Sequence, residues 1–131
     1  MERWWMVSEE KIRYWATLYN KEIGREDRIE NCVSYFMSLR DVAVFEETEQ
    51  YYWVYLIAPD QWGDKELHIV SLYIKPEYRT GKYFLEIQNK IKDVVRKNKV
   101  RYTMQGAHIN KKYFKFLKGI GYEVCSMRKE N

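Results

Sequence analysis

One stretch of the sequence, residues 66–106, constrains the fold more than any other. It opens with ELHIVSLYIK, whose β-branched and aromatic residues are typical of a strand. Pro76 ends this strand, because proline cannot donate a hydrogen bond to a strand ladder. A helical pattern over residues 82–97 and a second strand-like run, VRYTMQGA, follow. A strand, a crossover helix and another strand predict a parallel, right-handed unit within an α/β domain.

The segments before this unit predict two helices and a hairpin. Ser8 is a suitable N-cap for a first helix that ends at Gly24, with apolar residues at helical spacing between them. The same kind of spacing predicts a second helix over residues 27–39. Residues 42–58 are rich in β-branched and aromatic residues, and their polar link at 47–50 predicts a turn between two antiparallel strands.

The segments after the unit complete the expected order. A short helix is expected from residue 110 and a last strand from residue 122, and residues 3–7 are expected to add a short first strand. The order is then (β)ααβββαβαβ, with helices on both faces of a mixed sheet. Since no repeat and no Pro/Gly-rich linker interrupts it, we expect residues 1–131 to form a single domain.

Charge is distributed unevenly along the chain. There are 11 basic and 16 acidic residues up to position 88, but 12 basic and 3 acidic residues after it, which gives net charges of −5 and +9. A basic half can attract an anionic ligand or a nucleic acid. No nucleic-acid motif accompanies it, and five basic residues recur with polar neighbours along one predicted helix. We therefore favour a solvated helix face over nucleic-acid binding, which would require these residues to share one face of the fold. The five residues are Lys90, Lys92, Arg96, Lys97 and Lys99.

The sequence lacks the features of a membrane-spanning, secreted or metal-binding protein. No run approaches the roughly 20 apolar residues of a membrane-spanning helix, and the first ten residues have neither the apolar block nor the cleavage site of a signal peptide. The cysteines and histidines are not at metal-ligand spacing. We therefore expect a cytoplasmic protein without a membrane anchor or a metal.

Two motifs resemble the GNAT superfamily of N-acetyltransferases. Residues 72–79, LYIKPEYR, followed directly by a helix, resemble the family's acetyl-CoA-binding segment. Asn110, the pair Phe116-Leu117 and the pair Gly121-Tyr122 resemble a later motif of the family, in which a short helix leads to the final strand. The two motifs occur in the family's order and at about its distance, which implies a GNAT-like fold.

The same resemblance implies where acetyl-CoA is held. In the family the sheet splays open between two parallel strands, here residues 67–74 and 100–106, and the cofactor lies in the opening. The backbone of the first of these strands pairs with the pantetheine arm, and the turn before the long helix holds the pyrophosphate through backbone N–H groups. The residues so implied are Leu72, Tyr73, Ile74, Arg79, Thr80, Gly81, Lys82 and Asn110.

The turn departs from the family pattern, which begins with Gln or Arg and has glycine three and five residues later. Arg79 fits the first position, but Lys82 and Phe84 occupy the two glycine positions. Gly81 is the only glycine in the turn. Either the loop is shifted or shortened here, or the phosphate site has been lost.

Acyl transfer to an amine requires a base for the ammonium proton and an acid for the departing thiolate. The family often has its base six residues before the position of Ile74, which is His68 here, and an imidazole titrates near neutral pH. The family's proton-donating Tyr corresponds to Leu117, which cannot donate a proton, but Tyr113 lies one helical turn away. The resemblance thus implies His68 as base and Tyr113 as acid, although a half-buried strand histidine and a core tyrosine also explain them.

Two functions follow from these observations. The first is an N-acetyltransferase that moves an acetyl group from acetyl-CoA to a small-molecule or protein amine. The second is a catalytically silent GNAT-fold protein that acts by protein contact, such as a virion-associated or host-interacting protein of a bacteriophage, located in the host cytoplasm or the virion. Aromatic residues suited either to a contact surface or to the core are Trp4, Trp5, Tyr51, Tyr52 and Trp62.

Overall fold

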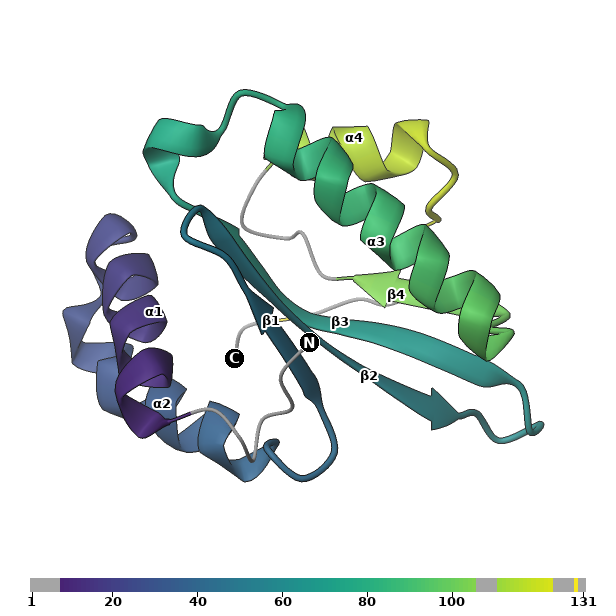
Figure 1. Ribbon diagram of the computed structural model, residues 1–131, viewed down its shortest axis with the longest axis horizontal. Coiled ribbons are helices and arrows are strands. Elements are labelled where there is room, and N and C mark those ends of the chain that lie inside the picture. The colour runs from purple at the N-terminus through teal and green to yellow at the C-terminus, as the bar shows by residue number, and fades with distance from the viewer. Residues whose placement is uncertain (1–7, 106–110, 124–128, 130–131) are drawn as a thin grey trace.

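The computed structural model describes residues 8–105, 111–123 and 129, and the side chains of Lys111, Tyr113 and Phe114 lie outside this description. The described residues form a four-stranded sheet flanked by helices (Figure 1). The strands are β1 (Val44–Glu47), β2 (Tyr51–Pro59), β3 (Lys65–Ile74) and β4 (Tyr102–Gln105). The α-helices are α1 (Glu9–Glu22), α2 (Ile29–Ser38), α3 (Lys82–Asn98) and α4 (Lys111–Gly119).

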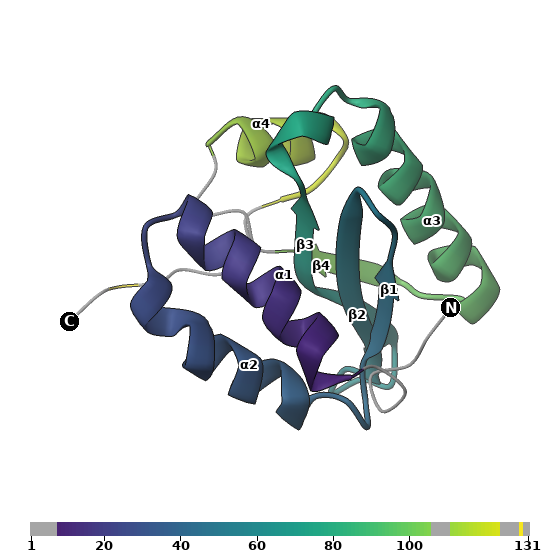
Figure 2. The same cartoon turned by 60° about the vertical axis from the view of Figure 1, so that its left-hand side comes forward.

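The sheet has the strand order β1-β2-β3-β4 and is mixed. β2 is antiparallel to both β1 and β3, and β4 is parallel to β3, with α3 as the crossover between them. Helices α1 and α2 cover one face of the sheet and α3 covers the other, as Figure 2 shows from the side. This confirms the expected α/β class and the βαβ unit. The expected strands at residues 3–7 and after residue 122 lie mostly or wholly outside the described residues.

The first face of the sheet is closed by α1 and α2. Ser8 caps α1, since its hydroxyl accepts a hydrogen bond from the N–H of Lys11 at 3.3 Å. Ile12 and Trp15, one turn apart, are 2% and 3% exposed and pack in one cluster with Tyr52 of β2. The predicted apolar face of α1 is therefore the one that holds it to the sheet.

Strand β2 lies in the middle of the core. Tyr51, Trp53 and Tyr55 pack in the cluster beneath α3, while Tyr52 and Val54 pack in the cluster beneath α1 and α2. This is the two-residue alternation of a strand buried on both faces. Apolar and aromatic residues on both faces of β2 explain why the run YYWVYLIA has no polar alternation.

The aromatic residues that the sequence assigns either to a contact surface or to the core divide between the two. Tyr51 and Tyr52 are 0% and 3% exposed, so they belong to the core. Trp62, in the turn between β2 and β3, is 77% exposed. Trp4 and Trp5 lie outside the described residues.

Strand β3 contains a β-bulge at Val70. Tyr55 pairs with Ile69 and Val54 pairs with Ser71, so Val70 has no residue opposite it on β2. The extra residue shifts the alternation of side chains by one position. As a result, four residues of β3 pack in the cluster beneath α3: Leu67 and Ile69 before the bulge, and Leu72 and Ile74 after it.

One expectation for the basic residues of α3 is wrong. Lys90 is not on a solvated face: its ammonium group bonds to the carboxylate of Glu46 on β1 and lies 5.2 Å from the ring centroid of Tyr51. The side chain thus ties α3 to the sheet. The other four basic residues are exposed as expected: Lys92, Arg96, Lys97 and Lys99.

None of the helices in the described residues is both long and apolar enough to cross a membrane. In the same residues, no group of three or more His, Cys, Asp or Glu side chains is arranged to hold a metal ion.

Candidate functional site

Strands β3 and β4 pair over only part of their length. Their parallel register runs from Glu66 opposite Tyr102 to Ile69 opposite Gln105. Residues 70–74 have no strand partner on this side within the described part of the chain, although residues 71–74 remain paired with β2 on the other side. Because alternate residues of a strand direct their N–H and C=O groups to opposite edges, this segment presents backbone hydrogen-bonding groups on the β4 side. Leu72, Tyr73 and Ile74 lie within it.

The turn after β3 enters α3 through Gly81. This glycine is the N-cap of α3 and has φ +93°, a conformation that favours glycine. A Cβ added here would meet no described atom within 4 Å, so the space at this position is open. No side chain of the described residues caps α3, and the first turn of the helix therefore directs backbone N–H groups and the positive end of its dipole outward.

The side chain of Arg79 binds α1 rather than the start of α3. Nη1 and Nη2 donate to the two carboxylate oxygens of Glu22, each at 2.8 Å, and Nε donates to the carbonyl oxygen of Ile74 at 2.8 Å. The guanidinium also lies 5.3 Å from the ring centroid of Tyr73, whose hydroxyl donates to Glu22 at 2.8 Å. Because its side chain is engaged in these contacts, Arg79 would bind a ligand through its backbone.

Glu22 is a site residue that the sequence analysis missed. It is the last residue of α1 and is separated from Arg79 by 57 positions, so no local pattern pairs the two. The hydrogen bond from Arg79 holds the pKa of this carboxyl below its ordinary value, against the opposing effect of burial. An ionised Glu22 therefore joins the end of α1 to the turn that precedes α3.

Thr80 and Lys82 flank Gly81 and are both exposed. The N–H of Thr80 donates to the carbonyl of Tyr78 at 3.0 Å, which helps to close the turn. The ammonium group of Lys82 lies 5.3 Å from the ring centroid of Tyr83. A positive charge thus stands beside the N-terminus of α3, where a helix already favours an anion.

His68 lies in the paired part of β3, opposite Leu56 of β2 and Met104 of β4. Its Nε2 is 3.0 Å from a carboxylate oxygen of Glu66, and its side chain is 37% exposed. Directly opposite residues share a face of the sheet, and Leu56 packs against the cluster beneath α1 and α2. His68 is therefore an accessible imidazole on that face, oriented by a carboxylate.

The second motif is only partly described. Asn110 and the side chain of Tyr113 lie outside the described residues, so the structure does not bring His68 and Tyr113 together or separate them. Leu117 is 4% exposed in the core. Tyr122, which follows α4, accepts a hydrogen bond from Nε2 of Gln105 at 3.0 Å, and burial raises the pKa of its hydroxyl.

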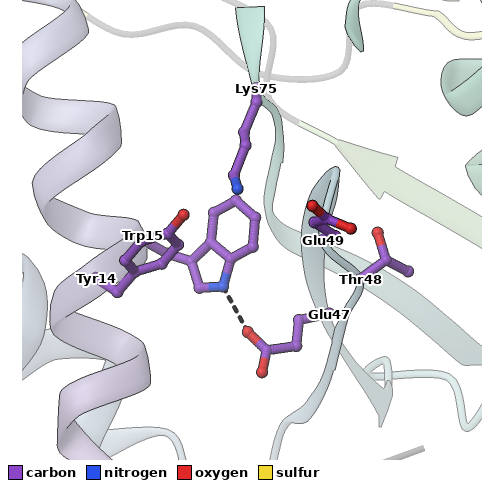
Figure 3. A pocket seen from close by; sticks show the side chains of 6 residues that line it. All are labelled: Tyr14, Trp15, Glu47, Thr48, Glu49 and Lys75. Atoms are coloured by element: carbon purple, nitrogen blue, oxygen red, sulfur yellow. Dashed lines mark hydrogen bonds between the residues drawn. The ribbon is translucent and has the colours of Figure 1, made fainter. Parts of the chain in front are cut away.

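A separate hollow of about 430 Å³ lies between α1 and the turn that joins β1 to β2 (Figure 3). The ammonium group of Lys75 lies 5.4 Å from the ring centroid of Trp15, and Nε1 of Trp15 donates to Glu47 at 2.6 Å. These contacts of Trp15 with Glu47 and Lys75 join α1 to the sheet beside the hollow. Its lining residues are Tyr14, Trp15, Glu47, Thr48, Glu49 and Lys75.

The described residues fit the cofactor that the resemblance implies. The start of α3 and Lys82 suit a pyrophosphate, and the unpaired edge of β3 suits the amides of a pantetheine arm. In addition, Gln88 of α3 is 9% exposed, and its Nε2 has no hydrogen-bond partner among the described residues. A buried donor without an acceptor is a polar group that a bound ligand can satisfy.

Comparison with known proteins identifies the fold. No protein-family model matches the sequence, and no protein of curated function matches it either. Solved structures do match. A predicted acetyltransferase from Clostridium acetobutylicum, solved with acetyl-CoA, has a TM-score of 0.68 at 12% identity, with 95% of this chain and 92% of that chain covered.

Two further structures give the same result. A GCN5-related N-acetyltransferase from Ralstonia eutropha JMP134 has a TM-score of 0.71 at 11% identity, covering 94% of this chain and 91% of its own. A ribosomal-protein-alanine N-acetyltransferase from Brucella melitensis has a TM-score of 0.63 at 10% identity, covering 94% and 96%. The chain therefore shares the fold of GNAT acetyltransferases, which confirms the fold expected from the two sequence motifs.

Proposed function

We propose that this protein is an N-acetyltransferase that transfers an acetyl group from acetyl-CoA to an amine. One observation carries the proposal: β3 leaves its pairing with β4 at Ile69, next to the bulge at Val70, and then runs directly into a turn and a helix capped by Gly81. A strand edge that has no strand partner within the described residues and a helix N-terminus suit the two chemically different parts of coenzyme A.

The binding residues have separate tasks in this proposal. Gly81, with Thr80 and Lys82 beside it, binds the pyrophosphate through backbone N–H groups and one positive charge. Leu72 and Ile74 bind the pantetheine arm through their backbone, because the backbone groups of Tyr73, between them, are directed to β2. Asn110, next to α4 in the sequence, is a further proposed contact. Arg79 keeps the turn in place by its bond to Glu22.

Acetyl-CoA, when bound, supplies an activated acetyl group as a thioester. His68 takes the proton that the amine loses, and Glu66, whose carboxylate oxygen lies 3.0 Å from Nε2, orients the imidazole. The Tyr113 hydroxyl returns a proton to the departing thiolate. This pairing of roles rests on the sequence motifs, with the His68–Glu66 contact in support.

The acceptor is a small-molecule or protein amine. Two acceptor classes are worth comparing, because the Brucella melitensis protein bears the name of a ribosomal-protein-alanine N-acetyltransferase. The first is a peptide that begins with alanine and the second is a small polyamine. A peptide with an internal lysine separates α-amino from ε-amino preference.

The decisive experiment has two stages. Isothermal titration calorimetry and thermal unfolding with acetyl-CoA measure binding, since a ligand that binds the folded state raises its stability by mass action. At a concentration 100 times the dissociation constant, the expected gain is about 2.7 kcal/mol. Release of free thiol with each acceptor then measures turnover.

The outcomes separate the two candidate functions. Saturable binding with acceptor-dependent thiol release supports the enzyme. Saturable binding without release for any acceptor supports the cofactor site but not the reaction. No binding and no thermal shift at millimolar acetyl-CoA would refute the transferase and favour a protein that acts by contact.

A further inference from the structure

Gln88 has a hydrogen-bonding capacity that the fold does not use. Its side chain is 9% exposed, and its Nε2 is buried with no partner among the described residues. Buried amide groups are nearly always paired in folded proteins, because leaving a donor unpaired costs free energy. An acceptor that is brought by a ligand would remove this cost.

The contacts of α3 show to which side Gln88 belongs. On one flank of the helix, Lys90 bonds to Glu46 of β1. On the other flank, the ring of Phe84 packs edge-on against Phe116 of α4, with 4.5 Å between the ring centroids. Gln88 follows Phe84 by one helical turn and so lies on the flank that faces α4.

The position of Gln88 along the sheet follows from the direction of α3. The helix begins just after the end of β3, and beyond its last residue the N–H of Arg101 bonds to the carbonyl of Lys65 at the start of β3. The helix thus runs back along the strand. The ring centroid of Tyr83, in its first turn, lies 6.2 Å from that of Tyr51, which pairs with Ile74. Gln88 is six residues into the helix, about 9 Å from its start, so it lies about two to three residues back from Ile74.

At this level along the sheet, β3 is no longer paired with β4. The bulge at Val70 lies there, and pairing with β4 has ended at Ile69. The Nε2 donor of Gln88 and the unpaired edge of β3 therefore lie on the same side of the sheet, at the same height. This is where the amide arm would lie under the proposed function, at a distance from the pyrophosphate turn.

We propose that Nε2 of Gln88 donates a hydrogen bond to an amide carbonyl oxygen of the pantetheine arm. This inference rests on the proposed function and adds to it a residue of α3 that binds the arm alone. Gln88 takes no part in binding the nucleotide end, because that end lies about 9 Å away at the first turn of the helix.

The test uses Gln88→Leu, which removes the buried donor and keeps the bulk of the side chain. Without a ligand, its melting temperature is expected to rise by about 4 °C, because an unpaired donor is gone. Calorimetry is expected to show affinity for acetyl-CoA and for CoA lowered about three- to tenfold. Affinity for adenosine 3′,5′-bisphosphate, which lacks the arm, is expected to stay unchanged.

A matched control comes from the other buried donor without a described partner. Nε1 of Trp53 is fully buried in the same cluster, but on β2. Trp53→Phe is expected to leave the affinity for acetyl-CoA unchanged, whatever it does to stability. If Gln88→Leu does not fold, Gln88→Met, of similar length, replaces it.

The outcomes distinguish this inference from the proposed function. If the wild type binds acetyl-CoA and the Gln88 variant binds it equally well, the role of Gln88 is refuted and the transferase proposal stands. If Gln88→Leu weakened the binding of the bisphosphate to the same extent, the role of Gln88 would also be refuted. The same holds if Trp53→Phe weakened the binding of acetyl-CoA equally, because a loosened core would then explain the loss. If the wild type binds neither coenzyme, both proposals fall together.

Discussion

Glu22 and Arg79, 57 positions apart, are joined by two parallel hydrogen bonds of 2.8 Å between a carboxylate and a guanidinium. Tyr73 adds a third hydrogen bond to the same carboxylate. Side-on pairs of this kind are among the stronger ion pairs in proteins because their geometry is fixed. The pair connects the C-terminal end of α1 to the turn that leads into α3.

Glu22→Gln is expected to reduce stability by about 1 kcal/mol at neutral pH, since the ion pair is partly exposed and its contribution is screened. The difference from the wild type is expected to shrink in acid. The folded-state pKa of Glu22 lies below its ordinary value, so its contribution is present above about pH 4.5 and is lost as the pH falls through the folded pKa. Urea unfolding at pH 7 and at about pH 3 measures both effects.

Glu30→Gln is the matched control for this prediction. Glu30 also pairs with an arginine, Arg13, but its side chain is 76% exposed. A smaller loss of stability than for Glu22→Gln is expected. An equal loss would show that position in the fold adds nothing to the Glu22 pair.

Gly81→Ala is expected to reduce both stability and affinity for acetyl-CoA. At φ +93° a Cβ costs about 1 kcal/mol, although no described atom obstructs it. The new methyl group also stands where the pyrophosphate is proposed to approach. Calorimetry is expected to show an affinity lowered by about tenfold, or 1.4 kcal/mol.

Gly63→Ala separates strain from ligand contact. Gly63 has φ +85°, has equally open surroundings, and lies in the turn between β2 and β3. A similar loss of stability, with unchanged affinity for acetyl-CoA, is expected. If both alanine variants lower the affinity alike, the turn at Gly81 is not the pyrophosphate site.

Local signals explain which parts of the fold the sequence predicts. The cap at Ser8, the polar link at residues 47–50 and the proline after β3 each act within a few residues, and the structure confirms all three. The order of the described elements and the parallel β3–β4 pair agree with the expectation. The place of the cofactor turn rests on the GNAT motifs and stays a prediction.

Features that depend on distant partners were not predictable. The bulge at Val70 appears only when β3 is set against β2, and nothing in the run HIVSLYI marks it. Lys90 looks like its solvated basic neighbours, but Glu46 lies opposite it in the fold. Gln88 looks like an ordinary polar residue at the edge of an apolar helix face, and only its burial shows otherwise.

Lys75→Met tests whether the hollow beside α1 is a structural joint. The substitution keeps the length of the side chain but removes the ammonium group, which lies 5.3 Å from the ring centroid of Tyr14 and 5.4 Å from that of Trp15. A loss of about 0.5–1 kcal/mol is expected in urea unfolding. Unchanged affinity for acetyl-CoA is expected as well, and a changed one would connect this hollow to the cofactor site.

His68→Ala is expected to lower the turnover number by about 10²- to 10⁴-fold, the usual contribution of a positioned base. The affinity for acetyl-CoA and the melting temperature are expected to change little, because the side chain is 37% exposed and contacts the nearby carboxylate of Glu66. Tyr113→Phe is expected to lower turnover while retaining cofactor affinity, since it removes the proposed proton donor. Turnover close to that of the wild type in either variant would remove that residue from the mechanism, and retained acetyl-CoA binding would confine the failure to the chemistry.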